Sequence, residues 1–138
     1  MLAQAFREGI ERKASRKGEG ALTTQERAIL AVTALFEEVN NGGYDQFLRN
    51  RSRKFVPIVV DSLMQVGLQA QAKITQQAIN ALELRSFNVS AINAAIAKES
   101  KERDDVLDEC DRSFYKIHRG VARKIYLFLK DNRSHIMF

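Results

Sequence analysis

The sequence predicts an all-α domain, a compact bundle of about six or seven helices with a long C-terminal helix. Of its 138 residues, only seven are glycine and one is proline, so few positions interrupt a helix. Alanine, leucine, glutamine, arginine, lysine and glutamate, which all favour helices, are frequent. Apolar residues recur at spacings of three and four along most of the chain. The length fits a single domain.

Residues 1–21 are predicted to form a helix and a basic linker that precede one helical domain over residues 22–138. Leu2, Phe6 and Ile10 stand four apart and form one apolar stripe of a short helix. Residues 13–20 hold two glycines and alternating charges, which are typical of a linker. We expect this N-terminal segment to pack on the domain or on a second subunit.

A second helix is predicted to begin at Thr23. Thr23 and Glu26 form the spacing of a capping box, in which each side chain accepts from the other's backbone N–H. The helix is predicted to stop at residues 40–43, because Asn and Gly accept the left-handed conformation of a helix end. Its core-facing residues are Ile29, Val32, Leu35, Phe36 and Val39.

The middle of the chain predicts three more helical stretches. A short helix follows the turn, and a basic loop over residues 49–54 leads to a helix that carries Pro57 in its first turn and ends at Gly67. The run 55–60 is also compatible with a strand, but Pro57 argues against a central one. Residues 70–84 predict the next helix.

The C-terminal third predicts a short helix capped by Ser90 and then one long helix. The long helix is expected from residue 106 or 107 to residue 128, where apolar residues fall three or four apart. Gly120 lies inside this pattern, which suggests that another helix packs closely against it.

The net charge of +5 and the isoelectric point of about 9.6 raise the hypothesis of nucleic-acid binding. The charges are unevenly distributed: residues 99–111 hold seven acids and two bases, and residues 112–133 hold seven bases and one acid. Acidic residues early and basic residues late in one helix first indicate a favourable interaction with the helix dipole. The basic residues that could form a binding surface are Arg49, Arg51, Arg53, Lys54, Arg112, Lys116, Arg119 and Arg123. The last four are spaced to share one helix face.

Three stretches of sequence resemble the bacterial DNA-mimic-protein family. They are residues 22–27 (Leu-Thr-Thr-Gln-Glu-Arg), 37–47 (Glu-Glu-Val-Asn-Asn-Gly-Gly-Tyr-Asp-Gln-Phe) and 107–115 (Leu-Asp-Glu-Cys-Asp-Arg-Ser-Phe-Tyr). The resemblance covers about residues 22–130. It implies a helical fold, a tendency to homodimerise and a role in binding another macromolecule. DNA mimicry itself requires a strongly negative protein, so we do not carry it over to a chain of net charge +5.

The signature around residues 40–47 has two interpretations. As a turn, it uses glycine where φ is positive, an aspartate cap and two aromatic anchors. As a surface, it offers a polar pocket or a partner-binding loop. The residues concerned are Asn40, Asn41, Gly42, Gly43, Tyr44, Asp45, Gln46 and Phe47.

No catalytic constellation, metal-ligand spacing or cofactor motif is found in the sequence. His118 and His135 are the only histidines, and neither has a second ligand at a metal-binding spacing. Cys110 is the only cysteine and lies on an apolar helix face, so we expect it to pack as a small hydrophobe. No run approaches the length of a membrane span. A single cysteine and no apparent secretion signal fit a cytoplasmic protein.

The sequence therefore predicts a non-enzymatic protein that binds another, unidentified protein as a regulator, inhibitor or immunity-type factor. The resemblance adds the expectation of a homodimer. Direct nucleic-acid binding through the basic loop and helix is the alternative function.

Overall fold

The prediction of an all-α fold is confirmed by a computed structural model that describes residues 2–137. In chain order the α-helices are α1 (Leu2–Lys17), α2 (Thr24–Arg49), α3 (Val56–Gln65), α4 (Gln69–Asn80), α5 (Val89–Ala97), α6 (Lys101–Lys116) and α7 (Val121–Asp131). Three short 3₁₀ helices cover Glu19–Ala21, Arg51–Phe55 and Arg133–His135. The segment 55–60 is helical, and Pro57 lies in the first turn of α3 as predicted.

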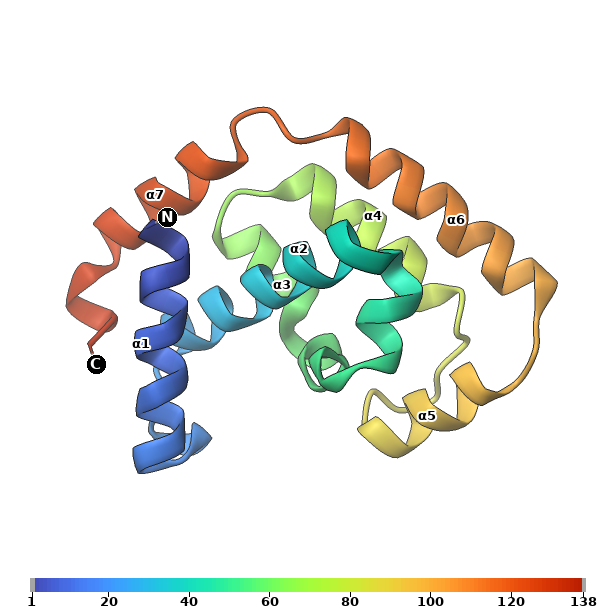
Figure 1. Cartoon of the computed structure of the whole chain (residues 1–138), viewed down its shortest axis with the longest axis horizontal. Helices are drawn as coiled ribbons and strands as arrows, with labels where there is room; N and C mark the ends of the chain where they lie inside the picture. Colours follow the sequence, from blue (N-terminus) through green and yellow to red (C-terminus); the bar gives the residue numbers. More distant parts are fainter. Residues whose placement is uncertain (1, 138) are drawn as a thin grey trace.

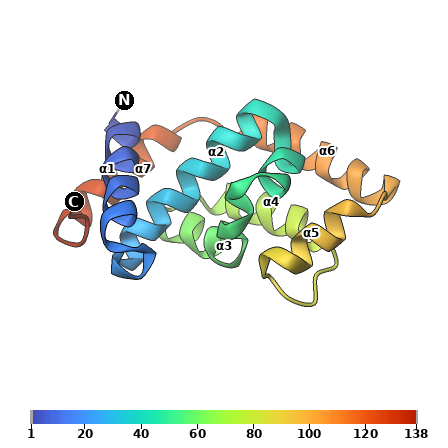
Figure 2. The same ribbon diagram turned by 60° about the horizontal axis from the view of Figure 1, so that its bottom comes forward.

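Helix α2 lies at the centre of the molecule and contacts α1, α3, α5 and α6 (Figure 1). Helix α4 packs between α3 and α6. Helices α1 and α7 lie side by side at one end, together with both termini, and α5 lies at the other end (Figures 1 and 2). The molecule is therefore a bundle around α2 with α1 and α7 joined to one end of it.

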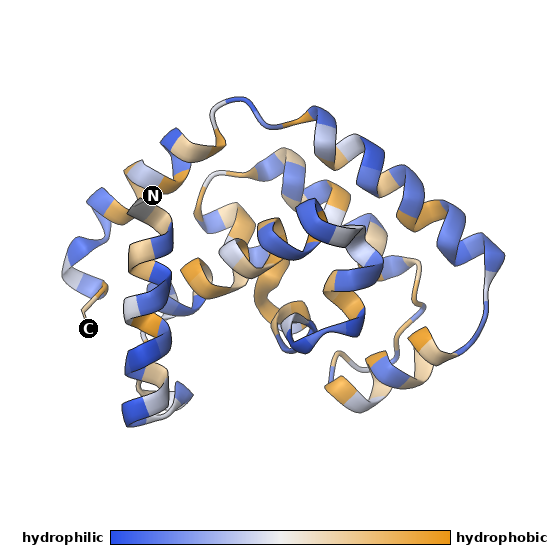
Figure 3. Cartoon of the chain, in the orientation of Figure 1, coloured by the Kyte–Doolittle hydropathy of each residue, from blue (hydrophilic) through white to orange (hydrophobic). Residues whose placement is uncertain are grey.

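The core forms where the apolar stripes of the helices meet. Ile29, Leu35 and Phe47 of α2 are fully buried, as are Leu63 of α3 and, to 2% exposure, Leu107 of α6. Figure 3 shows the complementary pattern on α6, where hydrophilic turns are interrupted by single hydrophobic positions. Because each helix buries one stripe only, the fold follows the three- and four-residue spacing seen in the sequence.

The N-terminal helix is longer than predicted, because residues 13–17 are helical and not part of a linker. Lys13 follows Ile10 by three residues and points to the same side, where both are buried. Helix α1 therefore packs on α2 and α7 of its own chain.

The capping box at the start of α2 forms as predicted and also joins three segments of the chain. The Glu26 carboxylate is fully buried and accepts from Lys13 Nζ at 2.8 and 3.0 Å and from the Thr23 N–H at 2.8 Å. It also accepts from the Met137 N–H at 3.1 Å. The Thr23 hydroxyl accepts from the Glu26 N–H and donates to the His135 carbonyl. Glu26 thus holds α1, α2 and the C-terminal segment together.

The prediction of one continuous helix through Gly120 is wrong. The chain leaves α6 at Lys116 and enters α7 at Val121, after Gly120 adopts a φ of +77°. A side chain rarely adopts this conformation, so Gly120 is the residue that turns the chain. No atom lies within 4 Å of a Cβ placed there, so the predicted close packing is absent. The Gln71 side-chain amide donates to the Ile117 carbonyl at 3.0 Å and fixes the turn on α4.

The helix bounds differ in two further places. Helix α4 ends at Asn80, not Leu84. The cap of α5 is Asn88 and not Ser90, because the Asn88 side chain accepts from the Ala91 N–H at 2.8 Å.

We predict that Glu26→Gln lowers the free energy of unfolding by about 3–5 kcal/mol, because it leaves the Lys13 ammonium buried without a counter-charge. Burial by itself raises the pKa of Glu26, but the bonds from Lys13, Thr23 and Met137 and the Lys13 charge hold it below its ordinary value of 4.5. The stabilising effect of the ionised group is therefore complete above that value and is lost as pH falls through the lowered pKa. Urea unfolding at several pH values measures both effects.

The matched control is Glu37→Gln on the same helix, where the carboxylate is exposed and pairs with Arg7. An exposed pair contributes about 0–1 kcal/mol, so this variant should stay close to wild type. Equal losses in the two variants would contradict the role assigned to Glu26.

Candidate functional site

The signature residues lie where α2 bends. The backbone leaves helical geometry at Gly42 (φ −154°, ψ 17°) and Gly43 (φ 80°, ψ −178°), and the helix resumes at Tyr44. The predicted interruption is therefore confirmed, although only Gly43 among residues 41–43 has a positive φ. A Cβ on Gly43 would lie 2.3 Å from Asp111 Oδ2, so this glycine is required both by its conformation and by the close approach of α6.

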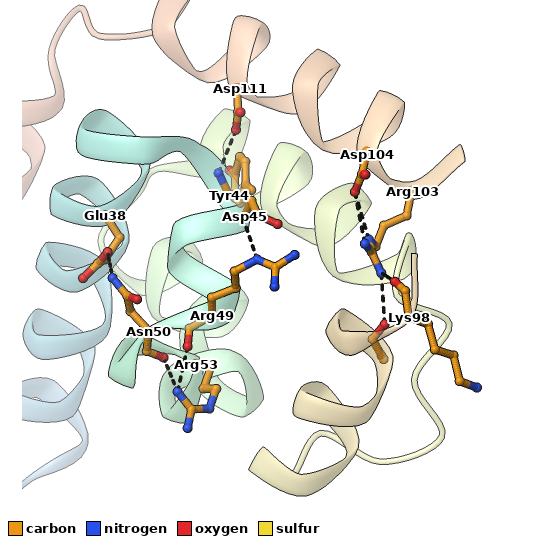
Figure 4. A network of polar contacts seen from close by, with 11 residues as sticks. Glu38, Tyr44, Asp45, Arg49, Asn50, Arg53, Lys98, Arg103, Asp104 and Asp111 are labelled. Carbon is orange, nitrogen blue, oxygen red and sulfur yellow. Dashed lines mark hydrogen bonds and ion pairs between the residues drawn. The ribbon is translucent and has the colours of Figure 1, made fainter. Parts of the chain in front are cut away.

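Helix α6 supplies partners for the backbone groups that the bend exposes. Asp111 Oδ1 accepts from the Tyr44 N–H at 2.8 Å, and the Tyr115 hydroxyl donates to the Val39 carbonyl at 2.8 Å. Asp111 and Tyr115 are four residues apart and therefore share one face of α6. Figure 4 shows Asp111 pointing from α6 to the backbone of Tyr44. The two ends of the bend are thus held by one helix face.

The aromatic residues of the two motifs pack together below these bonds. Tyr44 and Phe47 are buried anchors, as predicted. The Tyr44 ring meets Phe114 edge-on at 5.8 Å, and its hydroxyl is 2.7 Å from that of Thr75 on α4. Phe114 also contacts Phe36, with ring centroids 4.9 Å apart. The 37–47 and 107–115 motifs of the sequence are therefore the two sides of one packed junction.

The polar signature side chains bond mainly to their own helix. Gln46 and Asn50 both donate to Glu38 Oε2, at 2.6 and 2.9 Å, across the bend (Figure 4 shows the Asn50 bond). The predicted cap role of Asp45 is wrong, because its carboxylate pairs with Arg49 at 2.7 Å and Asp111 occupies the capping position. Asn40 and Asn41 are exposed.

Burial perturbs the ionisable groups of this junction. It raises the pKa of Asp111, and the Asp108 and Asp45 charges add to the rise, whereas the bond from the Tyr44 N–H opposes it. Burial likewise raises the pKa of the Tyr44 hydroxyl and, with the charges of Asp111 and Glu109, that of the Cys110 thiol. A buried thiol with a raised pKa is a poor nucleophile, which agrees with the packing role predicted for Cys110.

Three of the four cations of the basic loop that follows the signature bond to other groups of the chain. Arg51 is exposed and has no hydrogen-bonding or ionic partner among residues 2–137. The others have partners: Arg49 pairs with Asp45, Arg53 donates to the carbonyls of Arg49 and Asn50 at 2.9 and 2.8 Å, and Lys54 pairs with Glu19 at 2.9 Å. Carboxylates therefore neutralise Arg49 and Lys54, whereas the charges of Arg51 and Arg53 remain.

The four later basic residues do not form one helical ridge. Arg112 and Lys116 lie on α6, Arg119 lies in the turn, and Arg123 lies on α7. The helix break changes the chain direction between them (Figure 1). The acidic and basic blocks consequently belong mostly to different helices, with the acids on α6 and most of the bases on or next to α7.

The bases near α7 have no carboxylate partner among the described residues. We call Arg119, Arg123, Lys124 and Lys130 the C-terminal cations; all four are exposed. No ion pair or side-chain hydrogen bond between described residues involves any of them. Their charge is free to act on another molecule.

An apolar groove of about 870 Å³ lies beside these cations, between α1, α2 and α7. Phe36, Phe114 and Leu129 line it, with Val121, Ala122 and Ile125 along α7. The exposed rings of Tyr115 and Tyr126 also line it. We call this feature the α1–α7 groove. The groove was not predicted from the sequence, although the spacing of residues 121, 125, 126 and 129 indicates an apolar helix face.

Within residues 2–137, no three His, Cys, Asp or Glu side chains gather as a metal site would require. The carboxylates of Glu37, Glu38 and Asp45 bond to different partners and do not converge. No helix in this part of the chain is long and apolar enough to span a membrane.

The protein is thus a small, all-helical one in which a second helix, α6, bonds to both sides of a bend in the central helix. The chain belongs to the DMP19-like protein family, whose model matches residues 20–132. This confirms the resemblance to the DNA-mimic-protein family drawn from the three stretches of sequence. No curated protein and no solved structure matches the chain.

We predict that Gly43→Ala destabilises the fold more than Gly120→Ala. Both glycines have a φ near +80°, but only Gly120, with a ψ of 0°, lies in the left-handed region, where a side chain costs about 1–2 kcal/mol. Gly43 has a ψ of −178°, a conformation that essentially only glycine adopts. Only Gly43 also faces Asp111 at 2.3 Å, whereas Gly120 faces open space. Chemical denaturation of the two variants measures the difference. Equal losses would contradict the special requirement for glycine at position 43.

We predict opposite effects for two substitutions of Asp111. Asp111→Asn keeps an acceptor for the Tyr44 N–H and removes a buried charge, so stability at neutral pH should be maintained or increased. Asp111→Ala leaves that N–H unpaired and should cost about 1–3 kcal/mol.

The pH dependence gives a second readout for Asp111. Because the pKa of Asp111 is raised in the folded protein, the folded state binds a proton at a higher pH than the unfolded state does. The free energy of unfolding of the wild type therefore increases as pH falls through that pKa. Any advantage of Asp111→Asn should therefore shrink with acidification, as measured by urea unfolding. A constant difference would contradict the assignment.

Proposed function

We propose that this protein is a non-enzymatic regulator, inhibitor or immunity-type factor that acts by binding another protein through the α1–α7 groove. The observation that carries the proposal is an open apolar groove edged by exposed aromatic rings. Tyrosine side chains beside apolar pockets are typical of the residues that contribute most to protein–protein binding. A groove of this kind is also where a partner helix or loop can bury apolar surface.

The signature supports the proposal by its structural role. Its Asp45 and Gln46 side chains bond within the chain, its glycines form the bend, and its aromatic rings fill the core. The signature is accordingly interpreted as the framework of the fold, and the binding surface is placed next to it.

DNA mimicry is not proposed for this chain. A mimic needs free carboxylates at phosphate-like spacing, but the net charge is +5. On α6, Lys101 pairs with Asp105 at 2.8 Å and Arg103 with Asp104 at 3.1 Å. The acidic helix is therefore partly neutralised by its own cations.

Nucleic-acid binding is the second candidate, and the unpaired C-terminal cations are the observation that favours it. The neighbouring apolar groove favours a protein partner, because a phosphate backbone presents no apolar side chains to fill it. A polyanion would contact the cations and leave the groove empty.

The test is affinity capture from a lysate of the source cell with wild type and two variants. Ala122→Arg places a long charged side chain in the groove, and Gln77→Arg adds the same charge to an exposed position of α4. We expect a protein that wild type and Gln77→Arg retain and that Ala122→Arg loses, detected by mass spectrometry. Capture that is unaffected by Ala122→Arg would overturn the proposal.

A further inference from the structure

We infer that the partner segment bound in the α1–α7 groove is an acidic amphipathic helix. This inference rests on the proposed function and adds the chemistry of the partner. It depends on two features that lie side by side: the apolar lining of the groove and the unpaired cations along its α7 edge.

The groove is built to accept regularly spaced apolar side chains. Its α7 wall presents Val121, Ala122 and Ile125, and Leu129 follows one turn later. Residues at these spacings form a continuous apolar strip about two turns long. A helix that presents residues i, i+3, i+4 and i+7 offers the complementary strip. An apolar helix face is therefore the partner feature that matches this wall.

The α7 edge of the groove supplies positive charge. Arg123 and Lys130 lie three residues before and four residues after Tyr126, so the three side chains share one edge of α7. Tyr126 itself lines the groove and is 51% exposed. Both cations are exposed and lack any partner among the described residues. A ligand in the groove therefore meets two free cations on this side.

Among the described residues, the opposite edge offers no free positive charge, because its one arginine faces two carboxylates. Arg7 of α1 lines the groove but pairs with Glu11 at 2.9 Å and with Glu37. Positive charge is thus concentrated on one flank, which selects a partner whose carboxylates lie beside its apolar face. An apolar helix with a basic flank would meet repulsion from α7.

The probe is a fluorescent peptide of about four turns, with Leu and Phe at i, i+3, i+4 and i+7 and Glu on one flank. Fluorescence anisotropy measures its binding to the full chain, and circular dichroism measures helix formation on binding. We expect binding that weakens as salt rises from about 50 to about 200 mM, because screening reduces the contribution of the cations. A scrambled peptide of the same composition and a peptide with Lys in place of Glu should bind at least about tenfold more weakly.

Two variants locate the binding. Arg123→Glu with Lys130→Glu should weaken the acidic peptide by at least about tenfold, and Ala122→Arg should also weaken it, because it fills the groove. The matched control is Arg85→Glu with Lys98→Glu, which changes the net charge equally at exposed positions outside the groove. All these positions are on the surface, so the fold should be retained, and circular dichroism checks this.

Several outcomes would overturn the inference. One is equal binding of the acidic and scrambled peptides, and another is an equal loss in the two charge-reversal pairs. A third is tight binding of duplex DNA or single-stranded RNA that needs Arg123 and Lys130 but is insensitive to Ala122→Arg. If the peptide fails while the lysate partner still depends on Ala122, the proposed function stands and only the acidic-helix partner is rejected.

Discussion

The bend of α2 determines how α6 packs and, through α6, where part of the groove forms. It exposes the Tyr44 N–H and the Val39 carbonyl, and α6 pairs with both through Asp111 and Tyr115. Because an unpaired backbone group is costly, this double contact fixes the position of α6 along α2. It also brings Phe114 against Phe36 and Tyr44. These rings connect the bend to the groove, since Phe36 and Phe114 line it.

A second contact determines the other wall of the groove. Helix α7 meets the rest of the molecule mainly at α1, and α1 is held to α2 by the buried Lys13–Glu26 pair. Glu26 also accepts from the Met137 N–H, so the two ends of the chain meet at one carboxylate. The groove is therefore a product of both ends of the chain, although its lining comes largely from the C-terminal third.

The distribution of paired and unpaired charge separates structure from function. Lys13 and three of the four loop cations have partners within the chain, so they serve the fold. The C-terminal cations have none among residues 2–137 and stand beside an apolar groove. A binding surface needs charge that contacts within the fold have not already neutralised, and the C-terminal cations provide such charge.

The helical class, the capping box at Thr23 and Glu26, an interruption within residues 40–43 and the family could all be predicted from the sequence. These features depend on neighbours within about four residues, and local spacing records such neighbours well. The spacing also indicates that Asp111 is unusual, because this aspartate lies on the same helix face as the apolar residues Leu107 and Phe114. What Asp111 bonds to, however, lies 67 residues away.

The groove, the burial of Lys13 and the division of the last helix at Gly120 could not be predicted from the sequence, because they depend on how the helices pack. Apolar spacing continues through Gly120 as if the helix were unbroken, so periodicity cannot reveal a left-handed turn. Likewise, sequence shows where charges lie but not which of them are paired, because pairs such as Lys54 with Glu19 join distant residues. The free cations and the groove beside them exist only once the helices have packed.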